Sequence, residues 1–420
     1  MSFEEESVVG HFINRAREAR AKYSGTPTAT PVSPSQLWHD IHIDMHQKAI
    51  AGIDDERELA AFVTENNAFT FPRLVSDPEC APIAERFLEH LSRQGYPIDS
   101  LPPEYQESAL AGGKVVFERN GRRLSTMFLL QLCKAMRIRR HSVGVKTVVE
   151  IGAGYGGLAR TMKLAFPIST YCIVDLLDSL YFSYVFLSAN FPEAKTLLVT
   201  DRSQLGDISG YDFVFVPAEF VEGLYGRDVD LVVNTCSLGE MTQAAVDQYM
   251  ELIHRGLRTR YFYSMNRYGF RDPHFPADLC SSPVVLDRTW TVKAWDLWGE
   301  SGFAQIEPAT PPSLEILVER QLDVSQSDDV HLATARAYFN WSFAVEKRNS
   351  LWHFCLWNSI RHYPCRENLE VYLSELRAQP HFNELAHYAN VERLAPQVDL
   401  GLPDGLDHGG GPFQGVSAAA

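Results

Sequence analysis

The sequence predicts an α/β fold built on a mostly parallel sheet, with helical regions before and after it. From position 146 onward, short runs rich in β-branched and aromatic residues alternate with helical stretches, which is typical of parallel strands joined by crossover helices. The five clearest runs are 147–151, 171–174, 212–216, 231–234 and 261–265. Two final runs, 290–292 and 314–319, have no convincing long helix between them. We expect these two to form an antiparallel hairpin at the edge of the sheet.

The chain divides into four parts. Before position 140 apolar residues recur at helical spacing, and a proline-rich stretch at 24–36 interrupts them as a linker. After Gln321 the spacing is helical again to about Leu394. The last twenty residues hold six glycines and two prolines and too few large apolar groups to offset the entropy of ordering. We therefore expect a helical N-terminal region (1–140), an α/β domain (141–322), a helical C-terminal region (323–400) and a disordered tail (401–420).

Composition and charge exclude several classes of function. The chain has 420 residues, 45% of them hydrophobic and 22% charged, as in soluble globular proteins. Its 38 basic and 53 acidic residues give a net charge of −15, so phosphate backbones and anionic lipids repel it. The longest apolar run, 59–63, is far shorter than the roughly 20 residues of a membrane-spanning helix. With an acidic N-terminus unlike a secretion signal, these features predict a cytoplasmic protein without nucleic-acid or membrane partners.

Cysteine and histidine patterns do not indicate a metal centre. The seven cysteines include no Cys-x-x-Cys pair, which favours reduced thiols over a disulfide framework or a zinc site. His39, His42 and His46 have a spacing that could hold a divalent metal, but they flank an apolar helical stripe. We therefore favour packing against a buried face for these histidines and predict no metal ligands.

The most informative stretch is 148–159, a strand that runs into a glycine loop opening a helix. Gly152, Gly154 and Gly157 satisfy the G-x-G-x-x-G pattern of dinucleotide-binding proteins. Glu150, followed by Gly152, Gly154 and Gly156, also satisfies the acid-x-G-x-G-x-G pattern of enzymes that use S-adenosylmethionine. An acid at the end of the strand disfavours a neighbouring pyrophosphate but attracts the cationic amino-acid end of S-adenosylmethionine.

Two further observations bear on the ligand. Asp175 ends the second strand, where it can accept hydrogen bonds from ribose hydroxyls of either ligand class. None of the 17 tyrosines has a lysine four residues later, so the chain lacks the pair that many NAD-dependent sugar-modifying enzymes use. The sequence therefore indicates a nucleoside cofactor and favours S-adenosylmethionine.

The glycine loop, Asp175 and the run Asp-Leu-Val-Val-Asn-Thr-Cys-Ser-Leu-Gly-Glu-Met at 230–241 together resemble a family of bacterial sugar O-methyltransferases. These enzymes depend on S-adenosylmethionine and are associated with glycosylated natural products and surface polysaccharides. The resemblance spans roughly 110–320 and includes the segments 121–125 and 212–217. Positions 1–100 and 330–420 match no family that we can name.

The resemblance implies a Rossmann-like class I methyltransferase sheet of seven strands with a reversed last strand. The cofactor would lie across the carboxyl ends of the first strands. The residues that the resemblance assigns to it are Glu150, Gly152, Ala153, Gly154, Gly156 and Gly157 for the methionine part, Asp175 and Leu176 for the ribose, and Asn234 and Ser237 from the run at 230–241. The adenine contact stays open between Thr200-Asp201 and 217–219, which contains Glu219, because the chain has one β-like run more than the simple order requires.

Two residues are candidates for the chemistry of methyl transfer to a sugar hydroxyl. This nucleophile is weak, so a general base or a metal must remove its proton. Glu240 follows the fourth strand and is our first candidate for the base; the alternative is an acid that favours the N-terminus of the next helix. His274 lies on a loop after the fifth strand and is the second candidate; the alternative is a surface histidine. Asn266 and Arg267 could bond sugar hydroxyls or tie down the loop backbone.

The leading hypothesis is an S-adenosylmethionine-dependent O-methyltransferase acting on a small-molecule sugar or glycoside. A divalent metal is compatible with this chemistry but is not indicated. One alternative is an NAD(P)-dependent oxidoreductase, and another is a non-catalytic cofactor-binding partner subunit. The terminal helices could cap the substrate cleft or form a homo-oligomer, and their sequence does not distinguish these roles.

Overall fold

The computed structural model describes residues 8–23, 35, 38, 44–65, 80–109, 117–267, 286, 288–297, 313–321, 328–345, 350–364 and 366–376. Several sequence expectations lie outside these residues. They are His39, His42, His274, most of the proline-rich stretch at 24–36 and the tail at 401–420.

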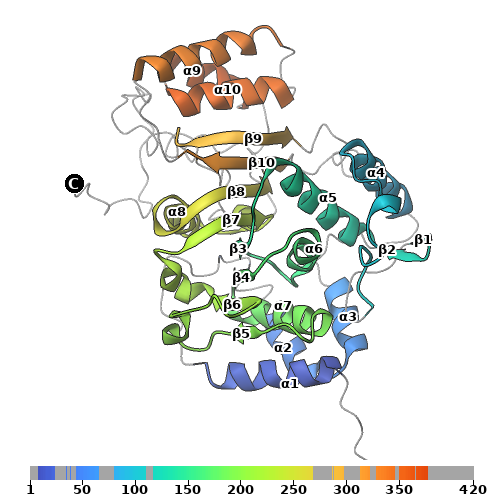
Figure 1. Ribbon diagram of the computed structural model, residues 1–420. Helices are drawn as coiled ribbons and strands as arrows, with labels where there is room; N and C mark the ends of the chain where they lie inside the picture. The colour runs from blue at the N-terminus through green and yellow to red at the C-terminus, as the bar shows by residue number, and fades with distance from the viewer. Residues whose placement is uncertain are drawn as a thin grey trace, which may run out of the picture.

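The centre of the molecule is an eight-stranded sheet, seen edge-on in Figure 1. Its spatial order is β5 (Thr196–Leu198), β6 (Phe213–Pro217), β4 (Thr170–Asp175), β3 (Thr147–Ile151), β7 (Asp228–Thr235), β8 (Arg258–Arg267), β10 (Ser313–Arg320) and β9 (Trp290–Leu297). The strands from β5 to β8 pair in parallel. β10 is antiparallel to both of its neighbours, β8 and β9. The predicted parallel sheet with a reversed last strand and an antiparallel edge pair is therefore confirmed.

The order of the strands creates a switch point at the centre of the sheet, where a crevice is expected. From β3 the chain moves outward to β4 and to the edge strand β5, fills the place between them with β6, and then crosses to place β7 on the other side of β3. In open α/β sheets, ligands bind outside the carboxyl ends of the strands at such a switch point. The loops that follow β3 and β7 therefore border the expected site.

The strands form where the sequence has nearly continuous apolar runs, as expected for strands buried on both faces. β3 reads Thr-Val-Val-Glu-Ile, and its alternate side chains enter two separate cores. Val148 packs in a core with helices that lie between residues 8 and 190. Val149 and Ile151 pack in a core with helices that lie between residues 243 and 376.

Helices cover both faces of this sheet, with α5 and α6 to its right and α8 to its left in Figure 1. Those before or within the first half of the sheet are α1 (Val8–Ala21), α2 (Asp44–Gly52), α3 (Glu56–Glu65), α4 (Cys80–Arg93), α5 (Thr126–His141), α6 (Gly157–Ala165) and α7 (Leu177–Asn190). The later ones are α8 (Gln243–Glu251), α9 (Asp328–Ser342), α10 (Ser350–His362) and α11 (Arg366–Leu376). Short turns of helix are η3 (Ile98–Ser100), η4 (Arg202–Leu205), η5 (Ala218–Leu224), η6 (Leu238–Glu240) and η7 (Leu252–Gly256). Within the described part of the chain, no helix is both long and apolar enough to cross a membrane.

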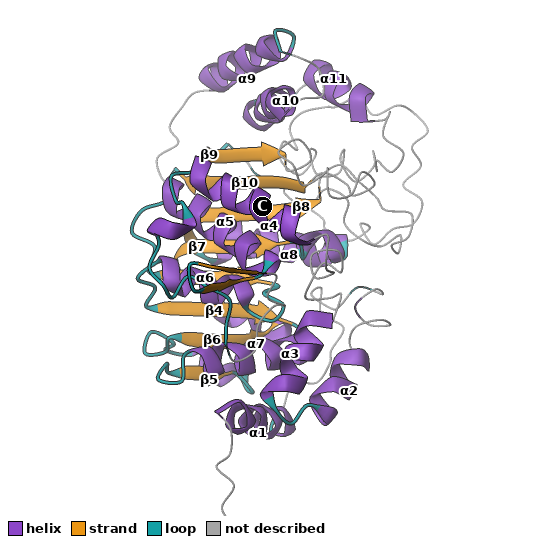
Figure 2. Cartoon of the chain, turned by 90° about the vertical axis from the view of Figure 1, so that its right-hand side faces the viewer, coloured by secondary structure: helices purple, strands orange, loops and turns teal. Residues whose placement is uncertain are grey.

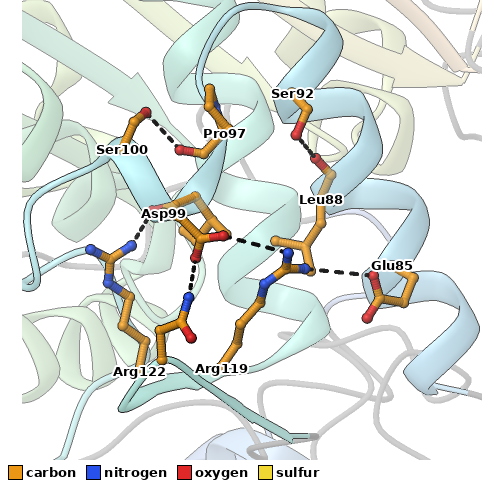
Figure 3. A network of polar contacts seen from close by, with 10 residues as sticks. Glu85, Leu88, Ser92, Pro97, Asp99, Ser100, Arg119 and Arg122 are labelled. Carbon is orange, nitrogen blue, oxygen red and sulfur yellow. Dashed lines mark hydrogen bonds and ion pairs between the residues drawn. The ribbon is translucent and has the colours of Figure 1, made fainter.

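The N-terminal region also contains a hairpin that we did not expect from the sequence, formed by β1 (Phe117–Arg119) and β2 (Arg122–Leu124). Asn120 and Gly121 form its two-residue turn with positive φ angles of 51° and 75°, which an Asn-Gly pair adopts readily. Arg119 connects the hairpin to Asp99 and Glu85, at 3.5 and 3.8 Å (Figure 3). The hairpin is short and polar, so it has no periodic apolar signal.

Aromatic stacking attaches the N-terminal helices to α7. Phe182 is fully buried, and its ring lies 4.7 Å from that of Phe62 in α3 and 5.3 Å from that of His46 in α2. His46 is 1% exposed, so this histidine packs in the core. Figure 2 shows α2 and α3 beside α7, on the side toward which the arrows of β4 and β6 point. Among the described residues, no group of three or more His, Cys, Asp or Glu side chains could hold a metal ion.

Candidate functional site

The loop between β3 and α6 has the backbone conformation that its glycines predict. Gly152, Gly154 and Gly156 have φ angles of 72°, 58° and 91°. Residues with a Cβ rarely adopt these angles, so the loop depends on glycine. The Gly152 amide donates to the carbonyl of Val174 at 2.8 Å, which joins the start of the loop to the end of β4.

Two of the glycines are also required by close packing. A Cβ on Gly152 would lie 2.2 Å from Oγ of Ser237, so the loops after β3 and β7 touch at this point. A Cβ on Gly157 would lie 2.4 Å from the hydroxyl of Tyr155, a buried ring that packs edge-to-face on Phe186. The packing of Tyr155 therefore accounts for Gly157, the third glycine of the dinucleotide pattern, without a ligand.

Asp175 holds the glycine loop from the end of β4. Its Oδ2 accepts from the amide of Gly154 at 3.1 Å, and its Oδ1 accepts from the amide of Leu176 at 2.7 Å. Burial raises the pKa of Asp175 to about 7, although these backbone donors and that of Ala153 oppose the shift. A carboxylate has about four acceptor positions, so Asp175 keeps capacity for a ribose hydroxyl.

Glu150 lies inside the protein, on the face of the sheet that α5 to α7 cover. It is 1% exposed and accepts a hydrogen bond of 2.7 Å from the hydroxyl of Tyr171 on β4. Burial raises its pKa to about 7, while the Tyr171 hydrogen bond and the charge of Lys134 on α5 lower it and the charge of Asp175 raises it. The carboxyl is thus placed next to the loop, and its contact with a cofactor stays a prediction.

Glu219 follows β6, which is the third strand counted outward from β3 through β4. β6 pairs with β4 so that Pro217 is opposite Asp175, whereas β5 pairs only with β6 at the edge. The end of β6 thus lies beside Asp175, whereas Thr200 and Asp201 follow the edge strand, and the choice between them for the adenine contact stays a prediction. Burial raises the pKa of Glu219. Its Oε1 accepts a hydrogen bond from the hydroxyl of Tyr23, just after α1.

Asn234 and Ser237 join the ends of the central strands. The side-chain amide of Asn234 donates to the carbonyl of Ile151 at 2.8 Å and to Oγ of Ser237 at 2.5 Å. Its oxygen accepts from the side chain of Asn266 at 2.8 Å. Asn266 also accepts from the amide of Gly239 at 3.4 Å, which favours the second of its two predicted roles, tying down the loop. The contact of Asn234 and Ser237 with a cofactor stays a prediction.

Glu240 lies at the end of η6, just beyond β7. It is half-buried; its amide donates to the carbonyl of Ser237, and its own carbonyl accepts from Oγ of Ser35 at 2.8 Å. Helix α8 has its own capping residue, Thr242, whose side chain accepts from Ala245. The N-terminus of α8 therefore does not depend on Glu240 for its cap. The catalytic roles of Glu240 and of His274, which lies outside the described residues, stay predictions.

Four residues near this site were not predicted from the sequence, namely Arg20, Tyr23, Asp178 and Tyr249. Tyr23 bonds Glu219, Arg20 pairs with Asp178 at 2.7 Å, and Tyr249 of α8 is buried with its pKa raised by burial and by the charges of Asp175 and Glu219. Arg17, Arg20 and Tyr23 recur at intervals of three, which predicts a polar side of a helix. That pattern gives no indication of partners more than 150 residues away.

Comparison with known proteins gives a likeness of fold only. No protein-family profile matches the chain, and no curated protein sequence matches it. Similar solved structures include M. capricolum TrmK with bound S-adenosyl-homocysteine (13% identity, 62% of this chain and 93% of that one, TM-score 0.29). Others are the ribosomal protein L11 methylase from Lactobacillus delbrueckii subsp. bulgaricus (14%, 46% and 80%, 0.28) and the methyltransferase domain of bacterial CtHen1 (12%, 46% and 99%, 0.29). With TM-scores this low, an assignment of activity has to come from the residues of the chain itself.

We predict that Gly152→Ala disrupts the site by steric contact with Ser237. Gly95→Ala is the matched control, because Gly95 also has a positive φ of 90° but a Cβ added there would meet no atom within 4 Å beyond its chain neighbours. Both variants should lose about 1–2 kcal/mol from backbone strain, and Gly152→Ala should lose more. Denaturant unfolding measures the difference. Equal losses in the two variants would contradict the close contact of the two loops.

We predict that the contribution of Glu150 to stability depends on pH. Its pKa is higher in the folded protein, about 7, than the ordinary value of 4.5. The folded state therefore binds the proton more tightly, so this contribution is fully present below pH 4.5 and is lost as the pH rises through 7. The stability of the native protein relative to Glu150→Gln should fall between about pH 5 and 8, by at most about 1.4 kcal/mol per pH unit. Denaturant unfolding at several pH values tests this, and a difference independent of pH would refute it.

Proposed function

We propose that this protein is an S-adenosylmethionine-dependent methyltransferase that acts on a hydroxyl group of a sugar. The observation that carries the proposal is the position of β10. A dinucleotide-binding sheet has six strands in the order 3-2-1-4-5-6. Here, with the edge strand β5 left out, β3, β4, β6, β7, β8, β9 and β10 can be numbered 1 to 7 in chain order. Their spatial order is then 3-2-1-4-5-7-6, and strand 7, which is β10, runs antiparallel to its neighbours, strands 5 and 6. This is the order expected for a class I methyltransferase.

The charge around the glycine loop also favours a cationic ligand. Glu150 and Asp175 lie close enough for the charge of one to raise the pKa of the other, and Glu219 follows the neighbouring strand. Carboxylates repel a pyrophosphate, whereas they attract an ammonium or a sulfonium group. The buried Lys134 offsets part of this negative charge from the α5 side.

The residues of the crevice fit the parts of S-adenosylmethionine. The backbone of Gly152 to Gly156 offers a surface without side chains, except for Ala153 and the inward-packed Tyr155, where the methionine part would lie. Asp175 would accept from the ribose, and Glu219 would accept from the adenine amine. When bound, this cofactor supplies a methyl group on a sulfonium, which leaves as a neutral thioether. The protein therefore has to align the nucleophile and exclude water.

The sugar hydroxyl as acceptor rests on the resemblance of 230–241 and on the place of Glu240. Glu240 ends η6, which follows β7, the strand that adjoins β3, so its carboxylate would lie at the rim of the proposed site. A base at this position would remove the proton of the hydroxyl as the oxygen attacks the methyl carbon. His274 is the second candidate for the same role.

We predict that the protein binds S-adenosylmethionine and S-adenosylhomocysteine but not NAD(H) in calorimetric titrations. Asp175→Ala should weaken binding of both by roughly 10- to 100-fold, because ribose hydroxyls lose a charged acceptor. Asp207→Ala, which removes an exposed aspartate that accepts hydrogen bonds from Ser209, should leave affinity unchanged. A preference for NAD(H) would favour an oxidoreductase instead, and no binding of any of the three would refute a cofactor site.

We predict that Glu240→Ala lowers turnover on the best acceptor from a sugar and glycoside screen by at least about 100-fold. Its affinity for S-adenosylhomocysteine should stay within about twofold of the native value, since a base contacts the acceptor and not the nucleoside. Glu251→Ala, which removes an exposed glutamate of α8, serves as the control. Unchanged turnover in Glu240→Ala would exclude this residue as the base and leave His274→Ala as the next variant.

A further inference from the structure

The C-terminal end of α1 reaches the place where the cofactor's base is expected. α1 crosses the lower end of the sheet below β5 (Figure 1). The hydroxyl of Tyr23 donates to Oε1 of Glu219, and the Tyr23 ring lies 5.7 Å from that of Phe220, tilted by 44°. A residue from the N-terminal region thus contacts two consecutive residues of the loop after the third strand.

A second contact fixes the same end of α1 near the ribose position. Arg20 donates from Nε to Oδ1 of Asp178 at 2.9 Å, and its guanidinium lies 2.7 Å from the same oxygen. Gln47 of α2 donates to Oδ2 of Asp178 at 3.2 Å. Asp178 is 8% exposed and lies three residues after Asp175, in the first turn of α7. The Asp178 side chain is 11% exposed and that of Arg20 36%, so the pair joins α1 to α7 at the border of the protein interior.

The contact between Tyr23 and Glu219 is a hydrogen bond from a phenol to a carboxyl group, and not only apolar packing. Glu219 is half-buried, and a half-buried carboxylate needs donors. Tyr23 supplies one donor to a single oxygen of the carboxylate. A carboxylate bonded through one oxygen has its second oxygen set in direction, and that oxygen can accept from an exocyclic amine.

We propose that Tyr23 is a positioning residue of the nucleoside site, which fixes Glu219 so that the protein selects a purine with a 6-amino group. This inference rests on the proposed function. The Tyr23 and Phe220 rings border the base, and Glu219 accepts from its amine. A base with a 6-oxo group offers an acceptor in place of this donor, so Glu219 repels it. Fixing Glu219 sharpens the discrimination, because a mobile carboxylate can turn away from the wrong base.

The test compares S-adenosylhomocysteine with its deaminated analogue S-inosylhomocysteine, by calorimetry, in the full-length protein. The native protein should prefer the adenine compound by at least about tenfold. In Tyr23→Phe, affinity for S-adenosylhomocysteine should fall by about 3- to 10-fold while affinity for S-inosylhomocysteine stays nearly constant. Tyr225→Phe is the matched control, because it removes a tyrosine hydroxyl from the residue that caps η5, the short helix that contains Glu219. Tyr225 is 45% exposed. Thermal unfolding of each variant shows that it is folded.

The outcomes separate this inference from the proposed function. If the native protein binds neither compound, both proposals fail. If it binds S-adenosylhomocysteine and Tyr23→Phe keeps the same affinity and the same preference, the methyltransferase proposal stands and Tyr23 has no role in the site. An equal loss of both compounds in Tyr23→Phe would show a purely structural role and would also refute the inference. Arg20→Ala removes the ion pair with Asp178 and leaves Tyr23 and Glu219 unchanged. Because it loosens α1, it should also reduce the preference for S-adenosylhomocysteine over S-inosylhomocysteine.

Discussion

Asn234 joins the ends of β3, β7 and β8, and the shape of the crevice depends on it. It is fully buried, and its amide group donates to Ile151 and Ser237 and accepts from Asn266 and from the backbone of Leu238. A buried amide with every group paired fixes its surroundings, because any displacement leaves a polar group without a partner. The β7 loop is thereby held against Gly152, where only glycine fits. Cys236, between Asn234 and Ser237, has a positive φ of 60°, as the sharp turn after β7 requires.

Two carboxyl groups, those of Glu150 and Asp175, belong to the strands whose ends meet near Asn234. Their protonation would respond to a charged ligand. Glu150 and Asp175 both have their pKa raised to about 7 by burial. Each carboxyl therefore takes up a proton more readily than an exposed one. A cation that enters the crevice lowers both pKa values and releases protons, whereas a phosphate raises them. An ammonium or sulfonium group in the proposed site would therefore favour the ionised form of both carboxyls.

The sheet could be predicted from the sequence because its strands are buried on both faces. Their side chains are apolar almost without interruption, and the five runs named from the sequence coincide with or overlap β3, β4, β6, β7 and β8. β5 is only three residues long and lies at the edge, so the sequence could not tell which run pairs directly with β4. The glycine loop was predictable because its positive φ angles require glycine. The hairpin of β1 and β2 was not, since strands of three residues with mostly polar side chains carry no period.

The contact between the end of α1 and the loop after β6 could not be predicted, because Tyr23 and Glu219 are 196 residues apart and neither position is unusual in its own stretch of sequence. Their contact depends on how α1 packs against α7, where Phe12 meets Tyr184 at 6.2 Å and Arg20 meets Asp178. Coupling between a ligand and such packing is reciprocal. If Glu219 binds the base better when Tyr23 is in place, then a bound nucleoside must also stabilise α1 against the sheet by the same free energy. The N-terminal helices match no family by sequence. On this argument, a bound nucleoside would stabilise their packing against the sheet, because a residue that follows α1 takes part in the proposed site.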